Sequence, residues 1–231
     1  MGKRIIQQAR GHGSLTYRVK RRAFSVKPSY PKKLEGEWTV KKIFRSAGHT
    51  APIIKLENEK KEYFYNLAAD KVYEGQRIVF GGKNIGDINF LSNLDVGTKV
   101  FNIENIPFDG GNLVRTGGNT AVILSKENNK VQVLMPSKEV KNLEMNCRAT
   151  VGELAGHGRL EKPVLKAGKK YYIKKAKSKK WPITSAVKVN AVDHPFGSGR
   201  GKRIKSKIVK RFASPGQKVG HLRPRRTGRK K

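Results

Sequence analysis

A mainly β fold is predicted, with two small β domains between long basic N- and C-terminal segments. The first observation is charge: residues 34–161 hold 17 Lys and Arg against 16 Asp and Glu. Residues 1–33 hold ten Lys and Arg and no acid, and residues 162–231 hold 24 against one acid. The second observation is that short β-prone runs alternate with polar turns throughout the middle. A nearly neutral middle can fold alone, whereas the basic ends bury too little apolar surface to offset their ordering entropy.

Composition excludes several classes of protein and site. The formal net charge is +34 over 231 residues, which indicates a polyanionic partner. The one cysteine, Cys147, excludes an internal disulfide and a cysteine-based zinc site and fits a reducing cytosol. The five histidines are too widely spaced for a zinc site. No apolar run of about 18 residues occurs, so no membrane span or membrane partner is expected. The N-terminus also lacks the apolar stretch of a signal peptide.

Residues 34–82 are predicted to form the first β domain, a small barrel or sandwich. The expected strands are residues 38–40, 51–56, 63–65 and 77–80, with turns at 45–49 and 57–60. Its aromatic residues have two interpretations. They are base-stacking platforms of an OB-fold, or they pack in the core, which general burial preferences favour for most of them. These residues are Phe44, Tyr63, Phe64 and Tyr65.

Residues 83–161 are predicted to form the second β domain, for which an SH3-like barrel fits the number and length of the strands. The expected strands are residues 99–103, 121–124, 131–134 and 147–152. The polar residues 126–130 between the second and third of these runs indicate a hairpin with a loop of five or six residues.

Residues 1–33 are predicted to be a basic tail with sparse regular structure, since Gly-rich and Pro-rich stretches interrupt it. Arginine binds phosphate with a planar fork, and the nearby Tyr17 and Phe24 rings are suited to stacking on bases. The alternative is an unliganded solvated tail. The candidate RNA-binding arginines are Arg4, Arg10, Arg18, Arg21 and Arg22.

Residues 162–231 form a second basic segment, and the Lys- and Gly-rich stretch 174–203 is its centre. Residues 169–175 are expected to begin a short ordered piece. A segment this cationic repels itself unless a polyanion neutralises it, and folded RNA is the predicted partner. The candidate contacts here are Lys174, Lys175, Lys180, His194, Arg200, Lys202, Arg203, Arg225, Arg226 and Arg229.

Asp193 and His194 leave several alternatives open. A Ser-His-Asp triad with Ser198 or Ser214 lacks any sign of an oriented nucleophile, so no enzyme is expected. His194 is chemically suited to act as a general base, but a cation that contacts phosphate is the favoured interpretation. Asp193 caps a turn, pairs with a nearby arginine or ligates RNA-bound Mg²⁺, and the turn with arginine is favoured.

Eight stretches occur in the order found in one known family. They read MGKRIIQQ at residues 1–8, HTAP at 49–52, NCRATVG at 146–152, KPVLKAG at 162–168, KWP at 180–182, NAVDHPFG at 190–197, PGQKVG at 215–220 and RRTGR at 225–229. In these the chain resembles the L-two family of large-subunit ribosomal proteins, in its archaeal and eukaryotic branch. The match extends over nearly the whole chain.

The resemblance implies an OB-fold barrel at residues 34–82, then an SH3-like barrel at 83–161, with extensions that enter large-subunit rRNA. It implies a cytoplasmic structural constituent of the large ribosomal subunit that supports subunit association and the peptidyl transferase region. Neighbouring ribosomal proteins and the small subunit are then expected partners, Trp181 and Asn190 join the rRNA-binding residues, and His194 is architectural. No cofactor is expected beyond rRNA-associated Mg²⁺. The alternative is an architectural DNA- or RNA-binding protein outside the ribosome.

Overall fold

The computed structural model describes residues 3–127, 129–199, 212, 219 and 220. The chain divides into two compact units. The body comprises residues Lys20–Lys169. The extension unit combines residues 3–19 with the described residues from Lys170 onward. None of the described helices is long and apolar enough to cross a membrane.

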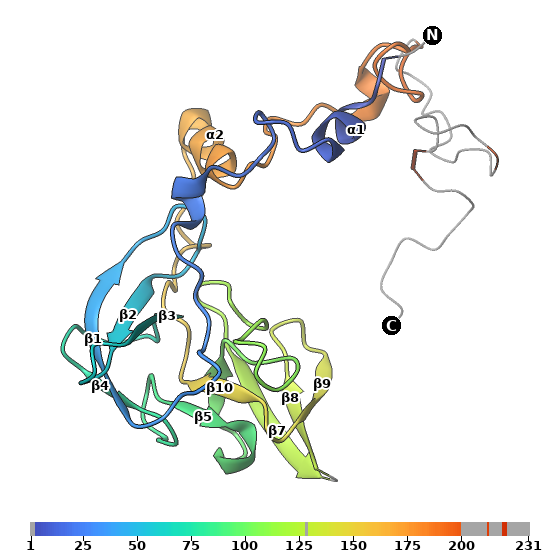
Figure 1. The fold of residues 1–231 in the computed structure, drawn as a ribbon. Helices are drawn as coiled ribbons and strands as arrows, with labels where there is room; N and C mark the ends of the chain where they lie inside the picture. Colours follow the sequence, from blue (N-terminus) through green and yellow to red (C-terminus); the bar gives the residue numbers. More distant parts are fainter. Residues whose placement is uncertain (1–2, 128, 200–211, 213–218, 221–231) are drawn as a thin grey trace. The chain divides into compact units, whose positions relative to one another are not determined.

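The first sheet of the body has four antiparallel strands in the order β3-β2-β1-β4 (Figure 1). Alternation of buried and exposed side chains along β1 places Trp38 and Val40 in a core with Leu56, Phe64 and Ile78. A shift of register between Val40 and Lys42 bends β1. The strands are β1 (Glu37–Phe44), β2 (Ile53–Glu57), β3 (Tyr63–Leu67) and β4 (Arg77–Val79).

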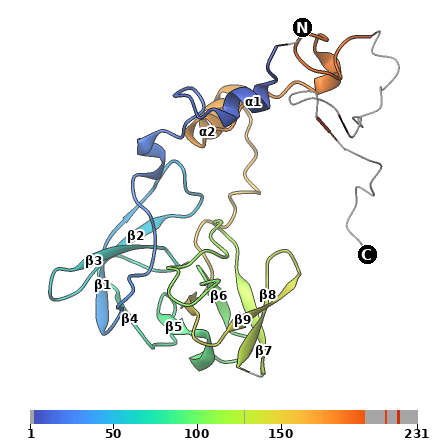
Figure 2. The same ribbon diagram turned by 45° about the vertical axis from the view of Figure 1, so that its right-hand side comes forward.

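The second sheet has six antiparallel strands in the order β5-β10-β6-β7-β8-β9. Figure 2 shows β7, β8 and β9 as neighbours in this sheet. Val100, Ile123, Val133 and Ala149 are fully buried in its core. The strands are β5 (Ile88–Phe90), β6 (Lys99–Phe101), β7 (Ala121–Glu127), β8 (Lys130–Leu134), β9 (Val140–Glu144) and β10 (Arg148–Val151), with the 3₁₀ helix η2 (Leu91–Asn93) after β5.

The mainly β prediction is confirmed by the two antiparallel sheets, and the prediction for the loop between β7 and β8 is wrong. The loop expected at residues 126–130 is much shorter, because β7 continues to Glu127 and β8 begins at Lys130, where the two residues pair. A register shift between Ile123 and Ser125 lets β7 run on with its polar residues exposed or half-buried.

The basic segments hold short helices. They are α1 (Ile6–Gly11), the 3₁₀ helix η1 (Arg21–Phe24), α2 (Ala167–Ala176) and the 3₁₀ helix η3 (Ala186–Lys188). The ordered piece expected at residues 169–175 is therefore a helix.

The body begins at Lys20, inside the segment predicted as a tail to residue 33. This segment belongs to the body because Tyr30 and Leu34 are buried in the core of the first sheet.

Candidate nucleic-acid interface

The arginine-bearing helix η1 is fixed to the body by backbone contacts. The carbonyl of Ala23 accepts hydrogen bonds from the Gly48 N–H at 2.6 Å and the Ser46 hydroxyl at 2.7 Å. A Cβ at Gly48 would lie 2.4 Å from that carbonyl, so a side chain has no room there. The Phe24 ring meets the edge of His49 with centroids 4.9 Å apart. The exposed Arg22 therefore projects from an anchored segment.

Residues 28–31, which follow η1, pass between the two sheets of the body. The N–H of Ser29 donates to the Tyr65 carbonyl of the first sheet, and the N–H of Tyr30 donates to the Gly110 carbonyl beside the second. The buried Tyr30 hydroxyl donates to the Asn102 carbonyl at 2.8 Å. Burial raises the pKa of Tyr30 well above its ordinary value, so the phenol stays protonated. This segment is structural and joins the two sheets.

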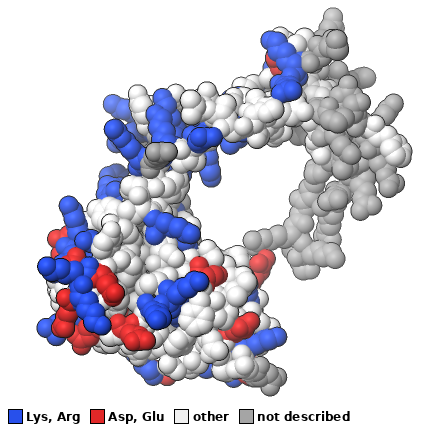
Figure 3. Space-filling view, viewed as in Figure 1, with Lys and Arg blue, Asp and Glu red and all other residues white. Residues whose placement is uncertain are grey.

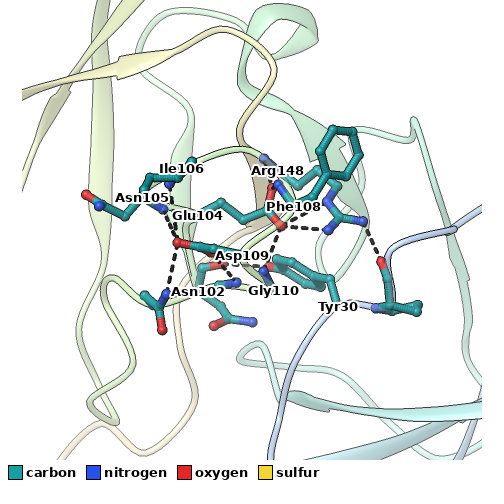
Figure 4. A network of polar contacts seen from close by, with 12 residues as sticks. Tyr30, Asn102, Glu104, Asn105, Ile106, Phe108, Asp109, Gly110 and Arg148 are labelled. Atoms are coloured by element: carbon teal, nitrogen blue, oxygen red, sulfur yellow. Dashed lines mark hydrogen bonds and ion pairs between the residues drawn. The ribbon is translucent and has the colours of Figure 1, made fainter.

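An ion pair between Arg148 and Glu104 lies beside this segment and is completely buried (Figure 4). The Arg148 Nη2 and Nε atoms donate to Glu104 Oε1 at 2.6 and 3.1 Å. The remaining Nη1 donates to the Pro31 carbonyl at 2.7 Å, and the guanidinium lies 5.0 Å from the Phe108 ring centroid and 5.5 Å from that of Tyr30. Each of the three guanidinium nitrogens thus donates to an acceptor, which makes the charge tolerable there.

In the extension unit, the N-terminal segment is hydrogen-bonded to the C-terminal one. The N–H of Lys3 donates to the Val192 carbonyl at 2.9 Å, and the Ser178 hydroxyl donates to the Tyr17 carbonyl. The Lys3 ammonium lies 4.0 Å from the Asp193 carboxylate. These contacts bring the cationic residues of two sequence-distant segments into one unit.

Helix α2 carries lysines and aromatic rings but no acidic and no buried residue. The Lys175 ammonium lies 5.4 Å from the Tyr171 ring centroid, and the Lys170 ammonium lies 5.4 Å from that of Trp181. Tyr172 meets Tyr171 edge to face at 5.4 Å and is 68% exposed. Figure 3 shows Lys and Arg gathered over this helix, whereas acidic and basic residues mix over the body. Lysine ammonium groups suited to binding phosphates and aromatic rings suited to stacking on bases thus lie on one surface.

The loop 189–198 is closed by its own backbone. The N–H of Ser198 donates to the Val189 carbonyl at 3.1 Å. The buried Gly197 packs on Asn190, since a Cβ there would lie 2.2 Å from the Asn190 carbonyl oxygen. The N–H of Phe196 donates to Nδ1 of His194 at 3.0 Å. The sequence indicated a loop here but gave no sign of how it is held.

The structure brings together only some of the predicted site residues. Those of the extension unit that are exposed are Arg4, Arg10, Arg18, Lys175, Lys180 and Asn190, whereas Lys174, Trp181 and His194 are half-buried. Arg21 and Arg22 belong to η1 of the body. Arg200, Lys202, Arg203, Arg225, Arg226 and Arg229 lie outside the described residues.

The structure gives contacts that bear on two of the alternatives from the sequence. Phe64 is buried, and Phe44 and Tyr65 pack edge to face at 5.9 Å against a hydrophobic core, so three of the four aromatics are core residues. Tyr63 is 59% exposed and lies under the Lys55 ammonium.

The N–H of Asp193 donates to the Asn190 carbonyl in a turn, as expected, but the charge partner of the Asp193 carboxylate among the described residues is Lys3 and not an arginine. No cluster of three or more potential metal ligands occurs in the described part of the chain.

Two joined β domains with exposed cationic extensions define a nucleic-acid-binding class of β protein. The chain belongs to the L2 family of ribosomal proteins, because residues 84–215 match the family described as "Ribosomal Proteins L2, C-terminal domain". An OB-fold followed by an SH3-like barrel, as this family implies, is consistent with the two sheets of the body.

Relatives along the whole chain agree with this assignment. The chain is 41% identical to a protein of Korarchaeum cryptofilum, covering 100% of the chain and 97% of the relative. It is 40% identical to one of Archaeoglobus fulgidus, covering 99% of each, and 42% identical to one of Methanococcus maripaludis strain C5, covering 100% of each. All three are named "Large ribosomal subunit protein uL2".

Proposed function

We propose that the chain is a structural constituent of the large ribosomal subunit and binds large-subunit rRNA. The observation that carries this is the separation of charge within a member of the L2 family. Sixteen of the 17 acidic residues lie in residues 34–161, while both basic segments together hold one. Its place is then the cytoplasmic large subunit, where it supports subunit association and the architecture of the peptidyl transferase region.

The two units contribute differently to binding. The body offers rigid shape, because its sheets and buried ion pair hold it together without a partner. The extension unit offers the charge, with α2 from Lys170 onward, residues 3–19 and the loop 189–198 as contact surfaces. Lysine and arginine neutralise phosphates between RNA helices, and the rings of α2 stack on unpaired bases.

Other partners follow from a place in the subunit. The near-neutral part of the body, residues 34–161, contacts neighbouring ribosomal proteins and the small subunit, since its mixed surface charge suits protein contacts better than phosphate. Mg²⁺ at the interface is held by the rRNA phosphates, and the protein contributes a carboxylate at most.

Salt dependence of rRNA binding tests this proposal. If about eight phosphates are contacted, the logarithm of the association constant falls with that of salt with a slope of about −6 to −7. A slope near −1 would contradict binding through the extensions. Competition with duplex DNA is the control, since equal affinity for DNA would favour an architectural role outside the ribosome.

A further inference from the structure

The ring of His194 is held by a backbone that leaves little freedom. The Asn190 carbonyl accepts the N–H of Asp193 at 3.0 Å and that of His194 at 3.2 Å. Gly197 donates its N–H to the His194 carbonyl at 2.8 Å and packs where any Cβ would collide with Asn190. The His194 side chain therefore leaves a closed loop in a fixed direction.

The hydrogen bond from Phe196 fixes which ring nitrogen carries the proton. A peptide N–H only donates, so Nδ1 of His194, 3.0 Å away, must offer a lone pair. The neutral ring then carries its proton on Nε2. Protonation of Nδ1 would direct two N–H groups at each other and break this bond.

The surroundings do not provide the counter-charge of an imidazolium. The adjacent Asp193 carboxylate is directed toward the Lys3 ammonium, 4.0 Å away. Among the residues that the structure describes, His194 makes no ion pair and its Nε2 has no hydrogen-bond partner. What the half-buried ring offers to a ligand is thus one neutral, directional N–H.

We propose that His194 determines specificity by donating its Nε2–H to an uncharged acceptor of rRNA, a base or ribose atom, while lysines and arginines contact the phosphates. This rests on the proposed rRNA binding. It replaces the cation on phosphate that the sequence favoured. A contact to an uncharged base acceptor selects a site, whereas a phosphate contact positions the chain without reading sequence.

Three variants of the full chain separate the roles of His194, with in vitro transcribed large-subunit rRNA of Archaeoglobus fulgidus as the probe. His194→Gln places a neutral amide donor near Nε2 and should bind within about twofold of the unmodified chain. His194→Asn keeps an acceptor near Nδ1 for the Phe196 N–H but lacks the distal donor. It should bind about three- to tenfold more weakly, the effect of one hydrogen bond. His194→Lys supplies a cation and should not restore affinity.

The salt dependence distinguishes a neutral contact from a charged one. The log–log slope should be the same for His194→Asn and the unmodified chain, because no phosphate contact is lost. The matched control is Lys180→Gln, in which the slope should become shallower by about 0.7 to 0.9. Dimethyl sulfate probing then identifies a base-nitrogen acceptor, which becomes more reactive in the His194→Asn complex, whereas a base carbonyl or ribose oxygen leaves the pattern unchanged.

Three results would overturn the proposal: full affinity of His194→Lys, a shallower slope for His194→Asn, or unmodified affinity of His194→Asn. The first two would show a cationic phosphate contact, and the third a role in the turn alone. If the unmodified chain itself fails to bind rRNA, the proposed function fails instead.

Discussion

At the scale of single residues, the buried ion pair of Arg148 and Glu104 is a position where removing one charge leaves the other without its partner. Glu104 also accepts the N–H groups of Arg148 and Gly110 at 2.9 and 3.0 Å. Glu104→Gln leaves a buried cation without its counter-charge, so we expect the free energy of unfolding to fall by about 3–5 kcal/mol. Urea denaturation followed by circular dichroism measures this.

The control for that substitution is Glu153→Gln. Its carboxylate pairs with the exposed Lys99, and an exposed pair contributes at most about 1 kcal/mol. Equal losses in the two variants would show that the Arg148 pair is not buried in solution.

Gly197 is the residue on which the position of His194 depends. In Gly197→Ala the new Cβ would lie 2.2 Å from the Asn190 carbonyl, so the loop must open. We expect rRNA affinity to fall about three- to tenfold, since the hydrogen bond of His194 is lost. Gel-shift titration measures this, and unchanged affinity of Gly197→Ala would contradict the closed loop.

Cys147 is expected to be chemically silent in the folded chain. It is fully buried, and this burial raises the pKa of its thiol to about 11. A raised pKa keeps the thiol protonated at pH 8, and only the thiolate reacts with alkylating agents. Mass spectrometry should find no iodoacetamide adduct in the native protein and full labelling in guanidinium chloride. Labelling of the native chain at the rate of a free thiol would contradict this burial.

At the scale of elements, α2 lacks the packing that stabilises most helices. It has ten residues, none buried, and its Lys170 and Lys174 repel each other one turn apart. We expect its amide protons to exchange rapidly in the free chain and at least about tenfold more slowly with rRNA bound. Hydrogen exchange read by mass spectrometry tests this, with the β7–β8 hairpin as a control that is protected in both states. Equal protection of α2 without RNA would contradict it.

Strands were predictable where apolar residues follow the pattern of the sheet. The run 51–56 contains two adjacent isoleucines and largely forms β2, whereas β9 has only Val140 and Leu143 as apolar residues and was missed. In β5 the central Asn89 is fully buried because its amide donates to the Gly81 and Gly82 carbonyls. Such tertiary partners leave no signal in the local sequence.

The candidate interface was likewise predictable from the sequence only in part. The charge distribution and the family motifs predict its cationic residues, because the positions of lysine and arginine are read directly from the sequence. The bond from Lys3 to Val192 and that from Ser178 to Tyr17 involve backbone groups, which every residue carries. For that reason the joining of the two basic segments was not predictable. The tautomer of His194 likewise depends on the position of a peptide N–H.

At the scale of the whole molecule, the N-terminal segment has two parts with opposite roles. Deleting residues 1–19 removes cations outside the body, so we expect the body to unfold cooperatively with nearly unchanged stability. Deleting residues 1–33 also removes the buried Tyr30, whose loss alone should cost about 3–5 kcal/mol. Thermal unfolding of both truncated chains tests this. Equal stability would show that Tyr30 does not join the sheets.

The contact of the Tyr30 hydroxyl with Thr150, 2.6 Å away, has a consequence for synthesis on the ribosome. The two residues are separated by 120 positions in the sequence, so Tyr30 leaves the exit tunnel long before its partner strand exists. A nascent chain that ends before Arg148 therefore lacks the Thr150 and Arg148 contacts of this side chain, and the Tyr30 hydroxyl should remain accessible to solvent until β10 emerges. Translation of β10, and not of the first sheet alone, then marks the moment at which these buried polar contacts of the body are complete.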